Sequence, residues 1–399
     1  MTDVQRILGA QALRAFLYGL CAVLLGTTLR ALDFSPLEAG LVLAMVVAGT
    51  VIASVAVARY GDRWGRRRWY GALFLALIPV GTVFAFASQA WVLAPVALLG
   101  VLSTEVVESG PFTSLEQAML ASELDGNRLV RTLGIYNAVA TGAGALGALA
   151  AAAPALLRDV WSGAPPDQRW FLLLIPSALV GAALARSLSS DVEPGRSAPS
   201  ARLVRSRPVI GRLSALFALD AFGGAFVIPS FLAYWFAERY GATPATIGAV
   251  FAAAGVLQTA SFVAAPRLAE RFGLLPTMVF THLPSNVLLV LVAFAPSLAW
   301  AIAALLARTC LSQMDVPTRQ AYVIELVDPD ERTAAVAYTN TARYAVRPTG
   351  PLLAGAASSI ALGLPIVIAG SVKAAYDLTL WRWFRPRHTP APPVEERTS

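Results

Sequence analysis

Eight ionisable side chains interrupt long apolar stretches of this 399-residue chain. They are Arg14, Glu105, Glu108, Glu116, Asp220, Arg308, Asp315 and Arg319. An ionisable side chain at the centre of a bilayer costs about 2.5 to 3.5 kcal/mol on insertion scales, so each is by default a hypothesis about function. A carboxylate in such a place binds protons or cations, and an arginine binds anions or pairs with a carboxylate. The expected chemistry is therefore binding and ion pairing.

The composition indicates that these stretches lie in a membrane. Hydrophobic residues make up 57% of the chain and charged residues only 14%, whereas soluble domains carry about 25% charged residues. The longest polar interval runs only from about residue 187 to residue 207, which leaves no room for a separate soluble catalytic domain. Two cysteines and two histidines supply neither a disulfide framework nor a zinc site, so we expect no metal and no cofactor.

Twelve apolar windows have the length needed to cross a bilayer, which is roughly 20 residues of helix. They run approximately over residues 8–29, 38–58, 70–89, 91–118, 130–155, 169–187, 209–236, 245–265, 276–295, 298–320, 333–357 and 360–381. We therefore predict an all-α membrane protein with twelve transmembrane helices.

Arginines are distributed unequally between the loops that join these windows. Twenty lie on the side that carries both termini, and only Arg30, Arg158, Arg169 and Arg239 lie on the other side. Because cytoplasmic loops concentrate basic residues, both termini should be cytoplasmic, in a multi-pass protein of the cell membrane. The same bias accounts for the net charge of +7 without a nucleic-acid partner.

The two halves of the chain repeat each other weakly. Five positions recur 208 residues later with the same or a similar side chain, namely Pro36, Gly40, Asp62, Arg63 and Gly65. Three recur 203 residues later, namely Gln117, Ala118 and Asp125. Such parallel repeats are typical of transporters. We predict two pseudo-symmetric six-helix bundles at residues 1–187 and 209–382, a cytoplasmic linker at 188–208 and a cytoplasmic tail at 383–399.

The segment between the second and third windows reads Asp62-Arg63-Trp64-Gly65-Arg66-Arg67-Arg68. It resembles the loop signature of the major facilitator superfamily, with Ala58 in place of the leading glycine and a second copy reduced to Glu270-Arg271-Phe272-Gly273. The twelve windows, the repeat and the linker match that family as well. The resemblance implies a gate in which carboxylates and guanidiniums pair across the two halves. Its predicted members are Asp62, Arg63, Gly65, Arg66, Glu270, Arg271, Glu116 and Arg319. The alternative is that Arg66, Arg67 and Arg68 only set the topology.

The same resemblance implies that the first, fourth, seventh and tenth helices line a central cavity, and these helices carry all eight ionisable residues named first. At 100° per residue, Glu105, Glu108 and Glu116 fall within about 80° of one another, which predicts one acidic stripe on the fourth helix. The offset of 203 matches Glu105 with Arg308 and Glu116 with Arg319. We therefore predict that each of these two pairs, and Arg14 with Asp220, faces across the pseudo-twofold axis. The alternative is that they are structural pairs that hold helices together.

Glu105 and Glu108 are the predicted sites for protons and for a cationic substrate, because Glu108 has no partner in this arrangement. Four more residues complete the predicted substrate and coupling site: Arg14, Asp220, Arg308 and Asp315.

Three further predictions concern the ninth, eleventh and twelfth windows. Arg343 and Arg347, four residues apart, either contact an anion or reach the cytoplasmic surface. Lys373 and Asp377 are expected to pair within the twelfth helix, and His282 is expected to pack in the ninth.

We expect a secondary active transporter that works by alternating access and exports an amphipathic or cationic small molecule by proton antiport. Its partners are then the substrate, protons and the lipid bilayer, and the chain acts as a monomer. The alternative within transport is an anionic metabolite or oxyanion, bound by the arginines of the cavity. A membrane-embedded enzyme is disfavoured because the chain has no H-E-x-x-H, G-x-S-x-G or P-loop motif, and we predict no catalytic residue.

Overall fold

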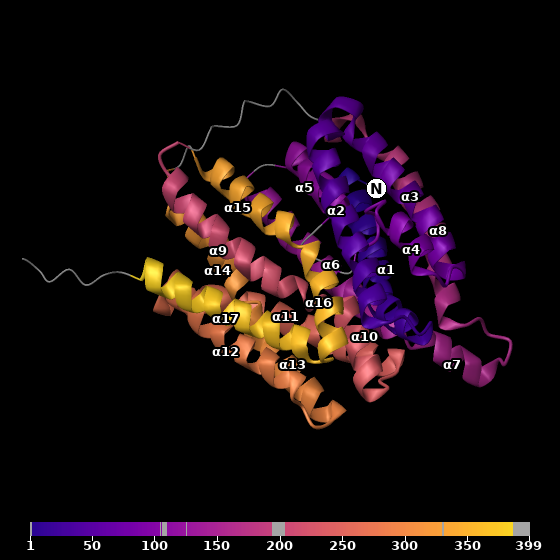
Figure 1. Cartoon of the computed structure of the whole chain (residues 1–399). Coiled ribbons are helices and arrows are strands. Elements are labelled where there is room, and N and C mark those ends of the chain that lie inside the picture. The colour runs from indigo at the N-terminus through magenta and orange to yellow at the C-terminus, as the bar shows by residue number, and fades with distance from the viewer. Residues whose placement is uncertain are drawn as a thin grey trace, which may run out of the picture.

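The computed structural model describes residues 2–103, 105, 110–124, 126–193, 204–328 and 331–385, and within these ranges the chain forms helices and turns without a strand (Figure 1). The helices of the N-terminal half are α1 (Asp3–Ala31), α2 (Pro36–Trp64), α3 (Arg66–Phe86), α4 (Ala90–Ala97), α5 (Pro111–Glu123), α6 (Gly126–Ala150), α7 (Ala153–Val160), η1 (Asp167–Leu173), α8 (Leu174–Ser187) and η2 (Ser190–Val192). Those of the C-terminal half are α9 (Arg207–Ala225), α10 (Pro229–Tyr240), α11 (Pro244–Phe272), α12 (Leu274–Ala293), α13 (Leu298–Ser312), α14 (Asp315–Glu325), α15 (Arg332–Val346), α16 (Thr349–Ile360) and α17 (Leu364–Phe384).

These helices follow the twelve predicted windows in chain order, and the all-α architecture is confirmed. Among the residues that the structure describes, eight segments are long and apolar enough by themselves to cross a membrane. The other four windows are those at 91–118, 298–320, 333–357 and 360–381. The first three are each divided into two shorter helices, and the last, α17, carries Lys373 and Asp377. The domain boundaries given above stay a prediction.

The repeated residues of the two halves mark where helices begin and end. Pro36 and Pro244 are at the first turns of α2 and α11, where a missing N–H costs nothing. Gly65 and Gly273 follow the last residues of the same helices with φ of +92° and +89°, a backbone conformation that glycine adopts at little cost. The residues related by the offset of 208 therefore lie at corresponding helix boundaries in the two halves, which are positions that a repeated fold has in common.

The two halves pack tightly at one end of the molecule, which we call the sealed end. There α1 packs against α10, α2 against α16, and α6 against α11. Each contact has a glycine whose place no larger residue could take without a shift, because a Cβ at Gly26, Gly40 or Gly248 would overlap the backbone of the other half. For Gly40 that Cβ would lie 2.6 Å from the carbonyl oxygen of Pro351. Small residues thus let the helix backbones touch, as in other membrane helix pairs.

Polar contacts reinforce the sealed end. The Ser230 hydroxyl donates to the carbonyl of Ala22 at 3.0 Å, and the Tyr234 hydroxyl donates to the carbonyl of Phe34 at 3.0 Å. Arg30 forms an ion pair with Glu238 between the same two halves. The halves are therefore fastened by specific bonds as well as by close packing.

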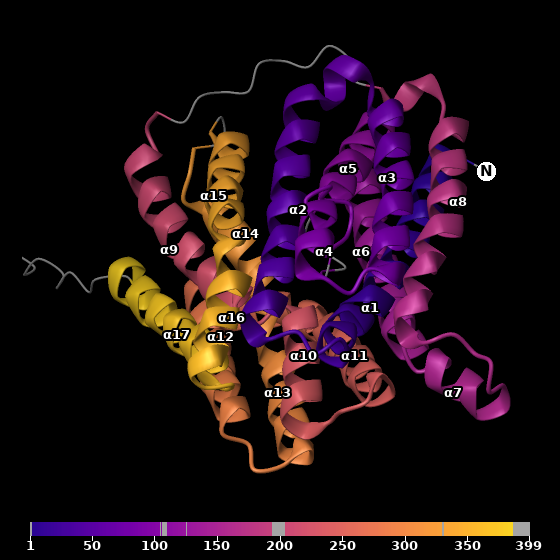
Figure 2. The same cartoon turned by 45° about the vertical axis from the view of Figure 1, so that its right-hand side comes forward.

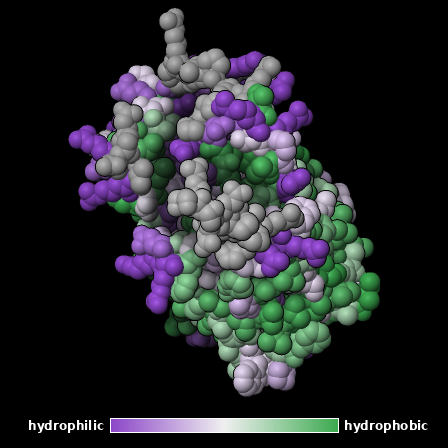
Figure 3. Space-filling model, turned by 90° about the vertical axis from the view of Figure 1, so that its left-hand side faces the viewer, coloured by the Kyte–Doolittle hydropathy of each residue, from purple (hydrophilic) through white to green (hydrophobic). Residues whose placement is uncertain are grey.

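The halves separate at the opposite end, which we call the linker end because α8 ends there and α9 begins there. Figure 2 shows α2 and α15 diverging toward this end, while α1, α10 and α11 come together at the sealed end. On the face drawn in Figure 3, hydrophilic side chains gather toward the linker end and hydrophobic side chains cover the lower part. An apolar belt below a polar rim is what a protein embedded in a bilayer presents.

Replacing Gly40 with alanine should destabilise the protein by about 1 to 3 kcal/mol, because the added methyl group overpacks the contact between α2 and α16. Thermal unfolding of purified protein in detergent measures this as a lower midpoint temperature. Gly211→Ala is the matched control, since a Cβ at Gly211 meets nothing within 4 Å. Equal melting temperatures for the two variants would show that the contact is looser than described.

Candidate functional site

A cavity of about 840 Å³ lies between the two halves, and helices from both contribute to its wall. The N-terminal half contributes α2, α5 and α6, and the C-terminal half contributes α11, α14 and α15. On α2 the lining residues run from Val46 to Ala58, the part of that helix nearer the linker end. The cavity therefore lies on the open side of the contacts that join the halves.

Pseudo-symmetric carboxamides line this cavity. Gln117 of α5 and Gln320 of α14 are related by the offset of 203, and so are Asn137 of α6 and Asn340 of α15. The glutamine pair was predicted from the sequence, whereas the asparagine pair was missed although the same offset relates its two residues. Hydroxyl groups of serine and threonine complete the polar lining, at residues 50, 54, 103, 113, 114, 141, 259 and 341. The wall thus offers both donors and acceptors of hydrogen bonds.

Three of the predicted site residues reach the cavity wall, namely Glu105, Arg343 and Arg347. Arg347 donates to the Glu105 carboxylate, and this ion pair joins the C-terminal half to the N-terminal half. Arg343 and Arg347 are one helical turn apart at the end of α15, so both face the same space. The predicted pairing of Glu105 with Arg308 is therefore wrong, and Glu105 pairs instead with the eleventh crossing.

The predicted acidic stripe is also wrong, because the fourth crossing is not one continuous helix. Its first part, α4, ends at Ala97, and α5 begins at Pro111, so Glu105 lies between the two helices and Glu116 within α5. Gly100 has φ +71°, and a Cβ there would overlap the backbone of α2 at Gly49. The chain leaves the helical path where it crosses α2. Glu108 lies outside the described residues.

Glu116 is buried in the N-terminal half, away from the cavity wall, and is fully enclosed by hydrogen-bond donors. Arg14 donates to its carboxylate at 2.5 Å, the Tyr70 hydroxyl donates at 2.7 Å, and the Tyr136 hydroxyl donates as well. Arg14 is only 1% exposed. The predicted pairs of Arg14 with Asp220 and of Glu116 with Arg319 are therefore wrong, because each charge finds a partner within its own half.

The C-terminal half contains the corresponding pair with the charges exchanged. Arg319 of α14 donates to Asp315 at 2.7 Å and lies 3.6 Å from Asp220 of α9. Thus the first and fourth crossings of one half carry arginine and glutamate, and those of the other half carry aspartate and arginine. The prediction of opposite charges at symmetric positions holds, but the pairs form inside each half. Asp315 is buried behind the wall.

Lys373 and Asp377 do not pair with each other, contrary to the prediction for α17. Lys373 donates to Asp220, and Asp377 accepts hydrogen bonds from Asn286 at 2.8 Å and from the His282 ring, whose Nδ1 lies 2.9 Å from Oδ1. At four residues apart on one helix, the two side chains point to the same side but reach different neighbours. His282 is therefore part of a buried polar cluster, and the packing role predicted for it is incomplete.

Arg308 of α13 is partly buried and does not line the cavity. Its Nε has no hydrogen-bond partner among the described residues. Its guanidinium interacts electrostatically with Asp220 and Asp315, so it belongs with the charges of the C-terminal half. The offset of 203 predicted that Arg308 faces Glu105. Because the helix is broken between α4 and α5, Glu105 occupies a different position.

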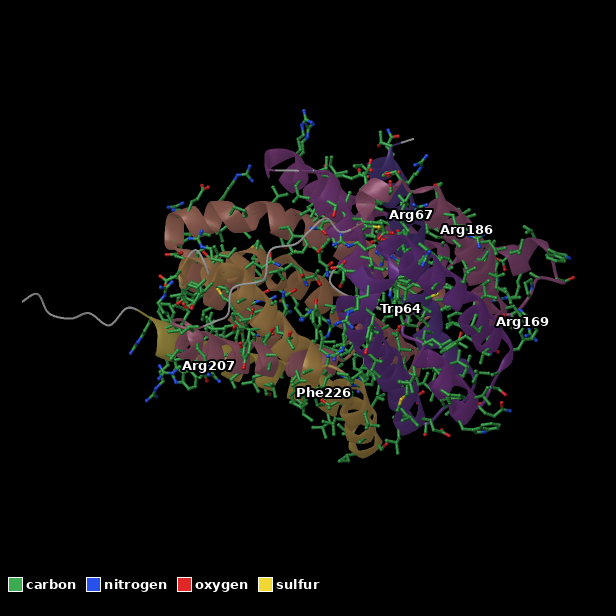
Figure 4. The ribbon with its side chains drawn as sticks, turned by 90° about the horizontal axis from the view of Figure 1, so that it is seen from above. Trp64, Arg67, Arg169, Arg186, Arg207 and Phe226 are labelled. Atoms are coloured by element: carbon green, nitrogen blue, oxygen red, sulfur yellow. The ribbon has the colours of Figure 1, made fainter. Side chains whose placement is uncertain are left out.

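Six of the predicted gate residues, namely those of the two loop signatures, lie at the linker end, whereas Glu116 and Arg319 are buried within their own halves. Arg66 donates to Asp62 at 2.8 Å, to Ser122 at 2.7 Å and to the carbonyl of Ala118 at 3.0 Å, all within the N-terminal half. Arg63, Glu270 and Arg271 are exposed, and Gly65 separates α2 from α3. In Figure 4, Arg67 and Arg186 lie on one side of the molecule and Arg207 lies on the other. Pairing of the gate across the halves stays a prediction for a different conformation.

Glu331 fastens the start of α9 to the C-terminal half. The backbone amides of Val204, Arg205 and Ser206 donate to its carboxylate at 2.7 to 2.8 Å. These bonds, that of Ser206 foremost, lower the pKa of Glu331 from 4.5 to about 2. Because the pKa is depressed, the attachment is fully present above pH 4.5 and is lost as the pH falls through about 2.

Comparison with known proteins gives one family and several structural relatives. The family model described as Major Facilitator Superfamily matches residues 7–351 and 213–398. An uncharacterised membrane protein of Saccharomyces cerevisiae, YJR124C, is 26% identical over 418 residues, which cover 95% of this chain and 93% of that protein.

Three solved structures share the fold at low sequence identity. The nucleoside transporter NupG has a TM-score of 0.72 at 12% identity, over 97% of this chain and 100% of that chain. The xylose transporter XylE from E. coli, in an inward-open conformation, has a TM-score of 0.71 at 13% identity, over 97% and 98%. A bacterial homologue of the lysosomal transporter Spinster, inward-facing and occupied, has a TM-score of 0.71 at 16% identity, over 96% of each chain.

Replacing Glu116 with glutamine should destabilise the protein by about 3 to 5 kcal/mol, because it leaves the Arg14 guanidinium buried without a counter-charge. The double variant Arg14→Met/Glu116→Leu should regain most of this loss, since it removes both charges. Thermal unfolding of the single variants Arg14→Met and Glu116→Leu and of the double variant completes a double-mutant cycle. Additive losses would mean that the two side chains do not interact.

Replacing Glu331 with glutamine should release the start of α9, because the charged acceptor of three amides is lost. Hydrogen exchange of a peptide that covers residues 204–210 should become roughly tenfold faster, the usual effect of losing a hydrogen bond to a charged group. Asp328→Asn is the matched control, since Asp328 is 50% exposed and pairs only with the Arg205 side chain among the contacts described. Equal exchange rates in the two variants would contradict the role given to Glu331.

Proposed function

The chain belongs to the major facilitator superfamily, and from that premise we propose that it carries a small organic anion across the cell membrane together with protons. It is a multi-pass membrane protein and a secondary transporter of a small molecule, not an enzyme. In such transporters two halves rock about a central site and expose it to one side of the membrane at a time.

The arginines of α15 carry the proposal of an anionic substrate. Arg343 and Arg347 both line the cavity, and Glu105 is the acid that lines it among the described residues. Two guanidiniums that face the same space offer a set of N–H donors that fits the oxygens of a carboxylate or a phosphate. An anion between them would accept their hydrogen bonds. This choice replaces the cationic substrate favoured by the sequence, because Glu105, one of the two carboxylates predicted to contact a cation, pairs with Arg347.

The remaining wall favours a polar substrate of modest size. Carboxamides and hydroxyls surround the arginines, so hydroxyl or amide groups on the substrate would find partners in several directions. A cavity of about 840 Å³ falls in the range of ordinary small-molecule sites. A carboxylate or phosphate ester bearing hydroxyl groups meets both requirements.

Glu105 supplies a route for proton coupling. When Glu105 is ionised, it forms an ion pair with Arg347. When Glu105 is protonated, the Arg347 guanidinium becomes available to the substrate. Proton and anion would then bind together, which favours cotransport over the antiport expected from the sequence. Glu108, the second predicted proton site, is left for experiment because it lies outside the described residues.

The orientation follows from the distribution of arginines. With the arginine-rich linker end in the cytoplasm, both termini are cytoplasmic and the open cavity faces inward. The sealed end then faces outward and is closed by the glycine contacts. In this proposal each chain contains a complete pathway and acts as a monomer.

Ligand binding tests the charge of the substrate directly. Purified protein is heated with a panel of hydroxycarboxylates and phosphate esters, neutral sugars, and lipophilic cations, and the shift of the unfolding temperature is recorded. We expect one or more anions to stabilise the protein, and Arg347→Gln or Arg343→Gln to weaken that binding by roughly 10 to 100 fold, the effect of one charged hydrogen bond. Arg382→Gln, an exposed arginine of α17, is the matched control.

A different pattern would refute the proposal. Stabilisation by lipophilic cations that is lost in Glu105→Gln and kept in Arg347→Gln would indicate a cation carrier instead. Once a stabilising anion is known, its uptake into proteoliposomes should follow an imposed pH gradient. Uptake that ignores the pH gradient and follows a sodium gradient would exclude protons as the driving ion.

A further inference from the structure

A second group of ionisable residues lies in the C-terminal half, behind the cavity wall and outside the mechanism proposed above. Its centre is His282 of α12, which is 3% exposed. The His282 Nδ1 lies 2.9 Å from the Asp377 carboxylate of α17, and its Nε2 lies 3.8 Å from the Asp220 carboxylate of α9. Two carboxylates that face one imidazole stabilise its protonated form by electrostatic attraction.

We propose that His282 and Asp377 form a proton-binding site, separate from the cavity, whose occupancy is transmitted to the cavity wall through Asp220 and the helix α14. The proposal rests on the proton-coupled transport proposed above and adds to it a second, buried site. A proton bound there converts the imidazole to imidazolium, held by Asp377 on one side and attracted to Asp220 on the other.

The charged groups that face this proton come from the helices around α12. Helix α17 brings Asp377 and Lys373, α14 brings Asp315 and Arg319, α13 brings Arg308, and α9 brings Asp220. The ionisable residues of α11 are exposed at the linker end. Three carboxylates therefore balance three permanent cations, so a neutral His282 leaves the cluster uncharged and one added proton gives it a single positive charge.

Asp220 is the group that senses this added charge. Its Oδ1 accepts a hydrogen bond from Lys373 and faces His282, and its Oδ2 lies 3.6 Å from Arg319. An imidazolium 3.8 Å away would compete with Lys373 and Arg319 for the same carboxylate. Protonation of His282 thus weakens the ion pairs through which Asp220 of α9 contacts Arg319 of α14 and Lys373 of α17.

Helix α14 connects the cluster with the cavity. Arg319 and Asp315 face the cluster, whereas their neighbours Gln320 and Val316 line the cavity. A small rotation or shift of α14 would therefore change the cavity wall and the cluster together. The distance between the two sites is short, and the coupling needs no element other than this helix.

The experiment exploits the histidine content of the chain, which is only two residues. In the variant His388→Gln, a single imidazole remains, and histidine labelled with ¹³C and ¹⁵N reports on His282 alone by NMR in lipid nanodiscs. Spectra recorded from about pH 5 to about pH 8 show whether the imidazole changes its protonation state. Asp377→Asn should lower the midpoint by about one pH unit or more, because it removes the facing carboxylate.

The conformational response is measured in the same range of pH without any substrate. Cysteines at Trp64 and Arg207, on either side of the linker end in Figure 4, carry spin labels in a background in which Cys21 and Cys310 are alanine. The label distance should change with the midpoint found by NMR, and His282→Gln should abolish that change. Arg382→Gln, an exposed residue of the helix that carries Asp377, is the matched control and should leave the midpoint of His282 where it was.

The outcomes are distinct. An imidazole that keeps one protonation state across this range, or a pH response of the distance that survives His282→Gln, overturns the proposal. So does a His282 that titrates while the distance stays constant. Should His282→Gln fail to fold, the shift in Asp377→Asn decides instead, both in the NMR midpoint and in the distance. Anion uptake that ignores a pH gradient would refute the proposed function but would leave these two observations unaffected.

Discussion

The structure depends on each half neutralising its own buried charges. In the N-terminal half Arg14 and Glu116 satisfy each other with help from two tyrosines, and in the C-terminal half Asp220 is shared among Lys373, Arg319 and His282. Breaking such a buried pair leaves a charge without a counter-charge in a medium of low dielectric constant, which lowers the free energy of unfolding by several kcal/mol. Each half is therefore held together by bonds that the other half does not share. Two bodies of this kind are able to move against each other without unfolding.

The contacts between the halves are of another kind. At the sealed end they consist of backbone touching backbone at glycine, with a few hydrogen bonds and one exposed ion pair. Within the cavity the described contact is the pair of Glu105 and Arg347. Breaking contacts of this kind costs less free energy than breaking a buried charge pair. They also lie where the two halves must separate or meet during a rocking motion. The division between strong internal pairs and weaker external contacts therefore suits alternating access.

Much of the fold was predictable from the sequence because hydrophobic length and the repeat are encoded locally. Twelve apolar windows, the glycine and proline positions at offset 208 and the charge exchange at offset 203 all have structural counterparts. The partners of the buried charges were not predictable. Helical periodicity says which residues share a face, but Gly100 and Pro111 interrupt the fourth crossing and turn Glu105 away from Glu116. Likewise, the spacing of Lys373 and Asp377 predicted a pair, whereas tertiary neighbours offered each a better partner.

The glycine contacts of the sealed end bear on how well the protein holds back ions while its cavity is open. Where Gly26, Gly40 and Gly248 let helices of opposite halves meet backbone to backbone, the gap at each contact is too small even for an added methyl group. A chain of waters would conduct protons across the membrane and dissipate any gradient across it. Glycine at these three positions therefore helps to insulate the two sides of the membrane from each other. A carrier with such contacts is expected to have a very low proton leak conductance at rest.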